Sequence, residues 1–130
     1  KIKLEFLPGD EHKIISDVML LGRAFSNVTS NCIRYAKETV QISVEAAGDR
    51  LKITIRDDGP GISEADLPHL FDRFYKGKNG NHGLGLSIAK RSMEYMGGNI
   101  EAESSPEGAI FMITLPQDCR SFAVEEWTEV

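Results

Sequence analysis

Two asparagines and an arginine lie on one side of the best-defined predicted helix of this chain. Asn27, Asn31 and Arg34 follow one another at intervals of four and three residues, so on a helix they project within about 60° of one another. An amide oxygen is a hard, uncharged ligand that suits a Mg²⁺ ion already carried by triphosphate oxygens. The spacing fits a metal-triphosphate site, and it equally fits polar side chains that face water or cap backbone groups.

Asp57, at the end of a predicted strand, is the second candidate. It opens the segment Asp57–Gly61, and its carboxylate can accept a hydrogen bond from an exocyclic amine such as that of adenine. Such a bond would select an amino purine over an oxo purine. Gly59 and Gly61 would let the backbone pass close to a ligand where a side chain would collide. The same residues also fit a simple turn.

The segment Gly83–Leu86 opens the last predicted helix. Unpaired N–H groups and the positive end of the helix dipole favour an anion there, and Gly83 and Gly85 would let phosphate oxygens reach them. The segment does not match the dinucleotide fingerprint, because Ile88 stands where the third glycine is needed, and the chain contains no GxxxxGK[ST] loop. Ordinary Rossmann and P-loop sites are therefore excluded, while a bare helix start stays open.

An aromatic cluster with one cation, Phe71–Tyr75, precedes a stretch rich in Gly, Asn and Lys from 76 to 82. The aromatic side chains could anchor a lid while Arg73 or Lys76 reaches a phosphate. Plain core packing is the alternative. The three histidines share no metal-ligand spacing, and no Ser/His/Asp or Cys/His pattern indicates a nucleophile.

Hydrophobic periodicity predicts the elements that position these residues. Asp17 is typical of a helix N-cap, and apolar residues then recur at helical spacing. A β-hairpin is predicted around the Gly48–Asp49 turn, a brief helix after Ser63, and the end of the last helix at Gly97–Gly98. The predicted strands are 2–6, 39–47, 50–56, 99–103 and 109–115, and the predicted longer helices are 18–36 and 86–96.

This order of elements predicts an α/β sandwich with helices on one face of a mixed sheet. We expect one domain over residues 1–116. The tail 117–130 carries glutamates beside Phe122 and Trp127, and its order is not predicted.

Composition limits the class of protein. The 130 residues carry a formal net charge of -5, which argues against a nucleic-acid binder whose affinity comes from Lys and Arg on phosphates. Cys32 and Cys119 form neither a zinc spacing nor a disulfide framework, so a reducing cytoplasm fits best. No apolar run approaches the roughly 18 residues of a membrane span. Because the chain begins at Lys1, we expect a fragment, whose parent can still be a membrane-anchored sensor.

The order and spacing of these segments resemble the ATP-binding catalytic domain of sensor histidine kinases, within the GHKL or Bergerat ATPase superfamily. The resemblance covers about residues 10–116 and implies a two-layer α/β sandwich with a mixed sheet of about five strands and about three helices on one face. The matching segments are the N box (Asn27–Ala36), the first glycine box (Asp57–Gly61), the F box (Leu70–Tyr75), the second glycine box (Gly83–Leu86) and the final glycine-rich strand motif (Gly108–Phe111).

The resemblance implies a role for each matching residue. Asn31 would coordinate Mg²⁺ with Asn27 alongside, while Arg34 and Tyr35 would lie near the phosphates and ribose. Asp57 would bind the adenine amino group.

The glycine boxes and the F box complete the implied site. Gly59 and Gly61 would line the base pocket, and Gly83 with Gly85 would cradle the phosphates. Arg73 would contact the phosphates from the lid and would share the catalytic role with Asn31. The remaining residues of the implied nucleotide-binding set are Ile62, Phe71, Lys76, Leu84 and Leu86.

The implied function is the binding of Mg-ATP and the donation of its γ-phosphate to a histidine on a separate dimerisation domain of the same kinase. The response regulator would be reached through the full-length protein. We expect the isolated domain to be monomeric and not to bind nucleic acid. The segment Glu11–Ile15 lacks the context of the family's phosphoacceptor, so the chain should bind nucleotide without phosphorylating itself.

Three other functions stay open. A related ATPase of the gyrase, mismatch-repair or chaperone kind would use a Glu in the helix that carries the asparagines, but no acidic residue occurs between Val18 and Lys37. An anti-sigma-type serine kinase has a similar domain, although the F-box segment speaks against it. The third is a nucleotide-binding module without catalysis. The family often has Ala where Cys32 stands, a departure that removes none of the chemical groups invoked.

Overall fold

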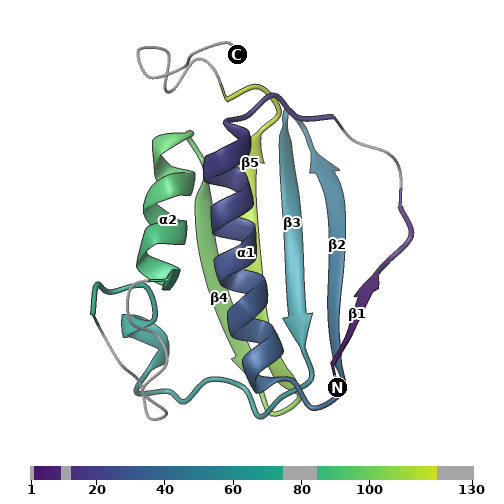
Figure 1. Cartoon of the computed structure of the whole chain (residues 1–130), viewed down its shortest axis with the longest axis vertical. Coiled ribbons are helices and arrows are strands. Elements are labelled where there is room, and N and C mark those ends of the chain that lie inside the picture. Colours follow the sequence, from purple (N-terminus) through teal and green to yellow (C-terminus); the bar gives the residue numbers. More distant parts are fainter. Residues whose placement is uncertain (1, 10–12, 75–84, 120–130) are drawn as a thin grey trace.

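The computed structural model describes residues 2–9, 13–74 and 85–119, which form one sheet with two α-helices packed on it (Figure 1). In chain order the elements are β1 (Lys3–Phe6), α1 (Val18–Tyr35), β2 (Thr39–Ala47), β3 (Arg50–Asp57), a 3-10 turn η1 (Leu67–His69), α2 (Gly85–Tyr95), β4 (Asn99–Ser105) and β5 (Gly108–Pro116).

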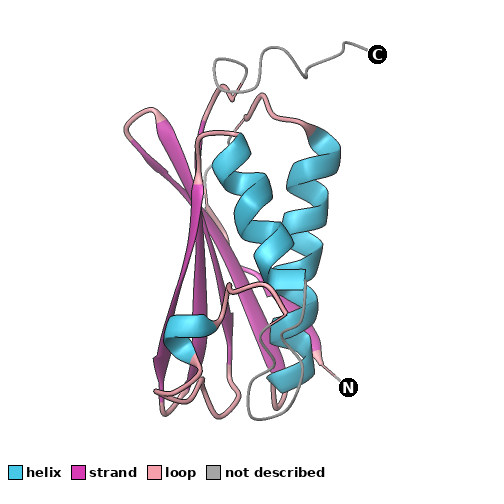
Figure 2. Ribbon diagram, turned by 90° about the vertical axis from the view of Figure 1, so that its left-hand side faces the viewer, coloured by secondary structure: helices cyan, strands magenta, loops and turns pink. Residues whose placement is uncertain are grey.

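The five strands are arranged in the order β1-β2-β3-β5-β4. β1 runs parallel to β2, and all other neighbouring pairs are antiparallel. Both α-helices lie on the same face of the sheet and leave the other face open (Figure 2). The predicted α/β sandwich with a mixed five-stranded sheet is therefore confirmed.

The described residues contain two α-helices and one 3-10 turn. The brief helix predicted after Ser63 is the 3-10 turn η1. Ser63 does cap this segment, since its hydroxyl accepts a hydrogen bond from the Asp66 N–H at 3.1 Å. The bonds that follow join residues three apart, such as His69 N–H to the Asp66 carbonyl. A turn held in this way rarely extends beyond three or four residues.

The start of α1 follows the prediction. The Asp17 carboxylate accepts hydrogen bonds from the N–H groups of Met19 at 2.9 Å and Leu20 at 3.1 Å. These bonds satisfy donors that the first helical turn cannot pair internally. Further along, Val28 and Cys32 of the predicted apolar stripe are fully buried against the sheet, together with Ala24. Val18, the first residue predicted for that stripe, is instead 80% exposed, because the first turn of the helix extends beyond the core.

Alternation along the strands decides which face each site residue occupies. Ile55 on β3 and its partner Phe111 on β5 are buried in the core beneath the helices. Asp57 lies two residues after Ile55 and so points to the helix side. Arg56, between them, points to the open face of the sheet.

The segments before α1 and after β5 are joined by a short parallel bridge between Ile15 and Asp118. The Ile15 N–H donates to the Gln117 carbonyl and the Cys119 N–H donates to the Ile15 carbonyl, each at 2.8 Å. Ordered contacts thus continue to Cys119, while residues 120–130 lie outside the described residues. The domain limits 1–116 stay a prediction. No helix in the described residues is long and apolar enough to cross a membrane.

Candidate functional site

The Asp57 carboxylate is buried, with 3% of the residue exposed. Its Oδ1 accepts hydrogen bonds from the N–H groups of Gly59 at 2.9 Å and Ala109 at 3.1 Å. Ala109 belongs to β5, so this carboxylate links the end of β3 to the neighbouring strand. With Oδ1 used by the protein, Oδ2 is the oxygen that can accept a bond from a ligand.

A thiol from α1 also contacts Asp57. Burial, together with the charge of Asp57 and a hydrogen bond to it, raises the pKa of the Cys32 thiol far above its usual range. The thiol therefore stays protonated and acts as a donor to the carboxylate. Sequence reasoning did not detect this contact, because Cys32 stood out only as a departure from the alanine common in the resembled family.

Gly59 and Gly61 leave no room for a side chain because neighbouring backbone lies against them. A Cβ on Gly59 would lie 2.2 Å from the Tyr35 carbonyl oxygen, and a Cβ on Gly61 would lie 2.4 Å from the Ser105 carbonyl oxygen. Protein backbone, not a ligand, occupies the space where their side chains would be. That the two glycines also line a base pocket stays a prediction.

Two residues of the β4–β5 hairpin complete this end of the site. A Cβ on Gly108 would lie 2.0 Å from the Asp57 carbonyl oxygen, and Gly108 has a φ of +141° that other residues rarely adopt. The Ser104 hydroxyl accepts a hydrogen bond from the Ile62 N–H at 2.6 Å, while Ile62 packs against the core. The hairpin therefore fixes the chain on both sides of the glycine segment.

Asp58 has a structural role that sequence reasoning missed. Its carboxylate accepts hydrogen bonds from the N–H groups of Lys37 at 2.7 Å, Glu38 at 3.1 Å and Thr39 at 3.2 Å. Desolvation alone would raise the pKa of Asp58, but the backbone donors of Glu38, Lys37 and Thr39 outweigh it and lower the pKa. The carboxylate clamps the connection between α1 and β2 to the end of β3.

The flank of α1 lies next to this end of β3. Cys32 and the Tyr35 carbonyl both contact the Asp57–Gly59 segment, and Asn31 precedes them on the helix. The Asn27 amide nitrogen donates to the carbonyl oxygen of Gly85, the first residue of α2, at 3.1 Å. The predicted polar residues of α1 therefore lie between the buried Asp57 and the start of α2.

The other predicted residues of α1 and α2 differ in exposure. Asn31 and Tyr35 are half-buried and Arg34 is exposed. Gly85 is exposed, with room for a Cβ because the nearest atom, Asn27 Cγ, would be 3.9 Å away. The Leu86 side chain is only 2% exposed and belongs to the core, so its side chain offers almost no surface to a ligand. Lys76, Gly83 and Leu84 lie outside the described residues.

The F-box segment is anchored by packing. The Phe71 ring meets the Phe111 ring edge-on at a centroid distance of 6.3 Å, and the Lys90 ammonium lies 5.2 Å from the Phe71 ring. Arg73 is exposed, and its guanidinium stacks 5.1 Å from the ring of Phe74. Phe71 therefore serves as a core anchor. The phosphate contact predicted for Arg73 stays a prediction.

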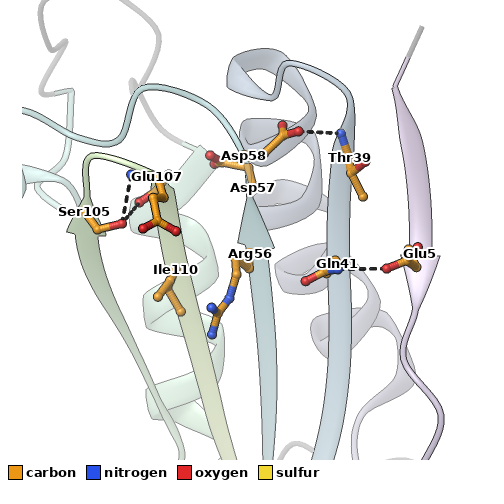
Figure 3. A pocket seen from close by; sticks show the side chains of 10 residues that line it. Glu5, Thr39, Gln41, Arg56, Asp57, Asp58, Ser105, Glu107 and Ile110 are labelled. Carbon is orange, nitrogen blue, oxygen red and sulfur yellow. Dashed lines mark hydrogen bonds between the residues drawn. The ribbon is translucent and has the colours of Figure 1, made fainter.

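A hollow of about 460 Å³ opens on the other face of the sheet (Figure 3). Gln41, Arg56 and Ile110 line it from three neighbouring strands, and the Gln41 amide donates to the Glu5 carboxylate at 2.8 Å. These side chains face away from the helices. Asp57, Asp58 and Gly108 also line the hollow, so it adjoins the end of β3 at which the candidate base-recognition carboxylate lies.

A family model described as "Histidine kinase-, DNA gyrase B-, and HSP90-like ATPase" matches residues 16–118. The chain belongs to this family. Within it, the chain has the fold and sequence of the catalytic ATPase domain of sensor histidine kinases, which confirms the resemblance. Membership of an ATPase family implies that the domain binds ATP.

Sensor kinases are among the most similar proteins. The signal transduction histidine-protein kinase AfsQ2 of Streptomyces coelicolor is 44% identical over 108 residues, which are 78% of this chain and 20% of that protein. The sensor histidine kinase CssS of Bacillus subtilis is 33% identical over 111 residues, covering 85% of this chain and 23% of CssS. The chain thus spans about a fifth to a quarter of the length of these relatives.

Solved structures agree with the fold. The mycobacterial sensor histidine kinase MprB matches with a TM-score of 0.73 at 26% identity, over 88% of this chain and 84% of that chain. The catalytic domain of the histidine kinase ThkA matches with a TM-score of 0.81 at 24% identity, over 92% of this chain and 81% of that chain. This ATPase domain therefore has the Bergerat-like sandwich of histidine kinase catalytic domains.

Proposed function

We propose that this domain binds Mg-ATP and donates the γ-phosphoryl group to a histidine on a separate dimerisation domain of a two-component sensor kinase. The observation that carries the proposal is the junction of α1 with the end of β3. There Cys32 and the Tyr35 carbonyl contact the segment that begins at the buried Asp57, and Asn27 on the same helix is bonded to the start of α2.

Asp57 is proposed to recognise the base. Its Oδ1 is held by the N–H groups of Gly59 and Ala109, which fixes the direction of Oδ2. An adenine amino group can donate to that oxygen, whereas the carbonyl of an oxo purine would face a carboxylate. The fixed geometry favours adenine because the carboxylate need not reorganise on binding.

The polar flank of α1 is proposed to hold the metal-triphosphate end. The Asn27 amide nitrogen is turned to Gly85, so its oxygen is turned the other way, and Asn31 lies one helical turn further along. Amide oxygens suit Mg²⁺ that is also held by phosphates and water. When bound, the ion would neutralise charge on the triphosphate. Arg34 and Arg73, both exposed, would add positive charge at the phosphates.

The nucleophile is proposed to come from outside this chain. An imidazole nitrogen of the dimerisation domain would form the bond to the γ-phosphorus while the bond to the bridging oxygen breaks and ADP leaves. The imidazole proton would pass to an acceptor on that domain. α1 contains no acidic residue that could activate water instead, which favours phosphoryl transfer over hydrolysis. We further propose a cytoplasmic setting and a response regulator that takes the phosphoryl group from the full-length protein.

The experiment is phosphoryl transfer in trans. The 130-residue chain would be incubated with γ-labelled ATP and Mg²⁺, with and without a dimerisation domain supplied as a second protein. We expect an acid-labile, base-stable label on the dimerisation domain only. Release of labelled phosphate without any labelled protein would contradict the proposal and favour an ATPase.

The metal assignment has its own test. Asn31→Ala should abolish the effect of Mg²⁺ on ATP affinity, measured by calorimetry with Mg²⁺ and with EDTA. Ser30→Ala, an exposed neighbour on the same helix, is the matched control and should respond to Mg²⁺ like the parent. An Asn31→Ala protein that still responds to Mg²⁺ in the same way would refute the role of Asn31.

A further inference from the structure

Three exposed apolar residues lie close together in sequence at the beginning of α1 and just before it. Val18 and Met19, the first two residues of the helix, are 80% and 74% exposed, and Ile15 is 46% exposed. These side chains contribute little to the core. Apolar side chains that cluster on a surface mark a contact site more often than single ones do. Ile15, Val18 and Met19 are called the helix-start patch below.

Basic residues flank the helix-start patch. Lys13 comes two residues before Ile15, and Arg23 lies one helical turn after Met19 and therefore on the same side of α1. Both are exposed, and neither forms an ion pair with an acidic group in the part of the chain that the structure describes. A segment that combines apolar side chains with glutamates would therefore match both the apolar patch and its basic flanks.

The end of the described chain is fixed beside this patch. The Cys119 N–H donates to the Ile15 carbonyl at 2.8 Å, and Cys119 is fully buried. The end of β5 and the beginning of α1 lie at the same end of the molecule (Figure 1). Residue 120 therefore continues the chain from a point next to Ile15, three residues before Val18.

Residues 120–130 have the complementary composition. A chain spans up to about 3.3–3.6 Å per residue, so the eleven residues after Cys119 can easily reach the first turn of α1. Because the segment is joined covalently beside the patch, its effective concentration there is high and a small contact area suffices. Its apolar residues include Phe122, Val124 and Trp127, and its acidic residues are Glu125, Glu126 and Glu129.

We propose that residues 120–130 dock on the helix-start patch of the same molecule. The aromatic side chains pack against Val18 and Met19, and the glutamates face Lys13 and Arg23. This contact covers the first turn of the helix that carries Asn27. It is independent of the proposed phosphoryl transfer, because none of its residues belongs to the candidate site.

Trp127 is the only tryptophan of the chain, so fluorescence without nucleotide tests the docking directly. In the full chain we expect emission at shorter wavelength, and weaker quenching by acrylamide, than in a peptide of residues 120–130. The double variant Val18→Ser/Met19→Ser should shift the emission to that of the peptide and raise the quenching constant severalfold. Far-UV circular dichroism should show that its fold is retained, since both side chains are exposed.

Phe6→Ser on β1 is the matched control, because Phe6 is 67% exposed but lies outside the patch, and it should leave Trp127 unchanged. Arg23→Glu should raise the quenching constant part of the way to the value of the peptide. Adding Glu125→Lys/Glu126→Lys to the Arg23→Glu variant should restore the parent value. A parent chain that emits and quenches like the peptide would overturn the proposal. Protection of Trp127 that disappears on dilution would also overturn it, since a second copy would then cover the patch.

Discussion

The two ends of the candidate site are built differently. At the base end, formed by Asp57, Gly59 and Gly108, backbone groups of distant segments are in close contact and the carboxylate accepts two N–H bonds. At the phosphate end, formed by the flank of α1 and the start of α2, the polar side chains of Asn27, Asn31 and Arg34 are half-buried or exposed. Substitutions at the base end should therefore reduce stability and binding together, and those at the phosphate end should reduce binding alone.

The largest expected effect comes from adding one methyl group at the base end. In Gly108→Ala the new Cβ would lie 2.0 Å from the Asp57 carbonyl oxygen at a φ of +141°, so we expect the free energy of unfolding to fall by about 3 kcal/mol or more. Gly85→Ala is the counterpart at the phosphate end, where the nearest atom would be 3.9 Å away. Its stability should change by less than about 1 kcal/mol. Urea unfolding measures the free energy of unfolding of both variants. Equal losses in Gly108→Ala and Gly85→Ala would contradict the difference between the two ends of the site.

Two substitutions of Asp57 separate its two roles. Asp57→Asn keeps an oxygen for the N–H groups of Gly59 and Ala109 but loses the charge, so ATP affinity should fall by about 1.5–3 kcal/mol, or roughly 10- to 150-fold, with a smaller loss of stability. Asp57→Ala leaves two buried N–H groups unpaired and should lose a further 1–3 kcal/mol or so of folding stability. Calorimetry and urea unfolding measure the two effects. Unchanged ATP affinity in Asp57→Asn would refute its role at the base.

The smallest expected effect concerns pH. Because the pKa of Cys32 is raised in the folded domain, its contribution to stability is complete below the unfolded pKa of about 8.5 and is lost as pH rises above that value. When the pH rises from about 8.5 to about 9.5, the free energy of unfolding of the parent should therefore fall by about 1 kcal/mol more than that of Cys32→Ala. Burial also raises the pKa of Cys119, but this thiol is present in both proteins. Identical pH dependence of urea unfolding in the two proteins would show that the pKa of the thiol is not raised in the folded domain.

Hydrophobic periodicity was sufficient to predict most elements. The Asp17 cap, the hairpin around Gly48–Asp49 and the end of α2 near Gly97 are local features, and the structure confirms them. The brief helix predicted after Ser63 is a single 3-10 turn. Its type was not visible in the sequence, because a short α-helix can begin with the same Ser63 cap. The strand order and the parallel pairing of β1 with β2 were not predicted, since they depend on contacts between distant segments.

The candidate site was predicted only in part. The chemical types and order of Asn27, Asn31 and Asp57 were visible in the sequence, and the structure brings their elements together. The reasons for Gly59 and Gly61 were not visible, because the atoms that exclude a side chain are the carbonyls of Tyr35 and Ser105, distant in sequence. Nucleotide contacts of individual residues stay predictions.

The Asp58 clamp gives the junction between α1 and β2 its own tolerance to acid. Because the pKa of this carboxylate is lowered, it stays ionised at a pH at which an ordinary aspartate has begun to take up a proton. Its bonds to the N–H groups of Lys37, Glu38 and Thr39 persist over that range. Mild acidification should therefore leave the end of α1 in place beside Asp57.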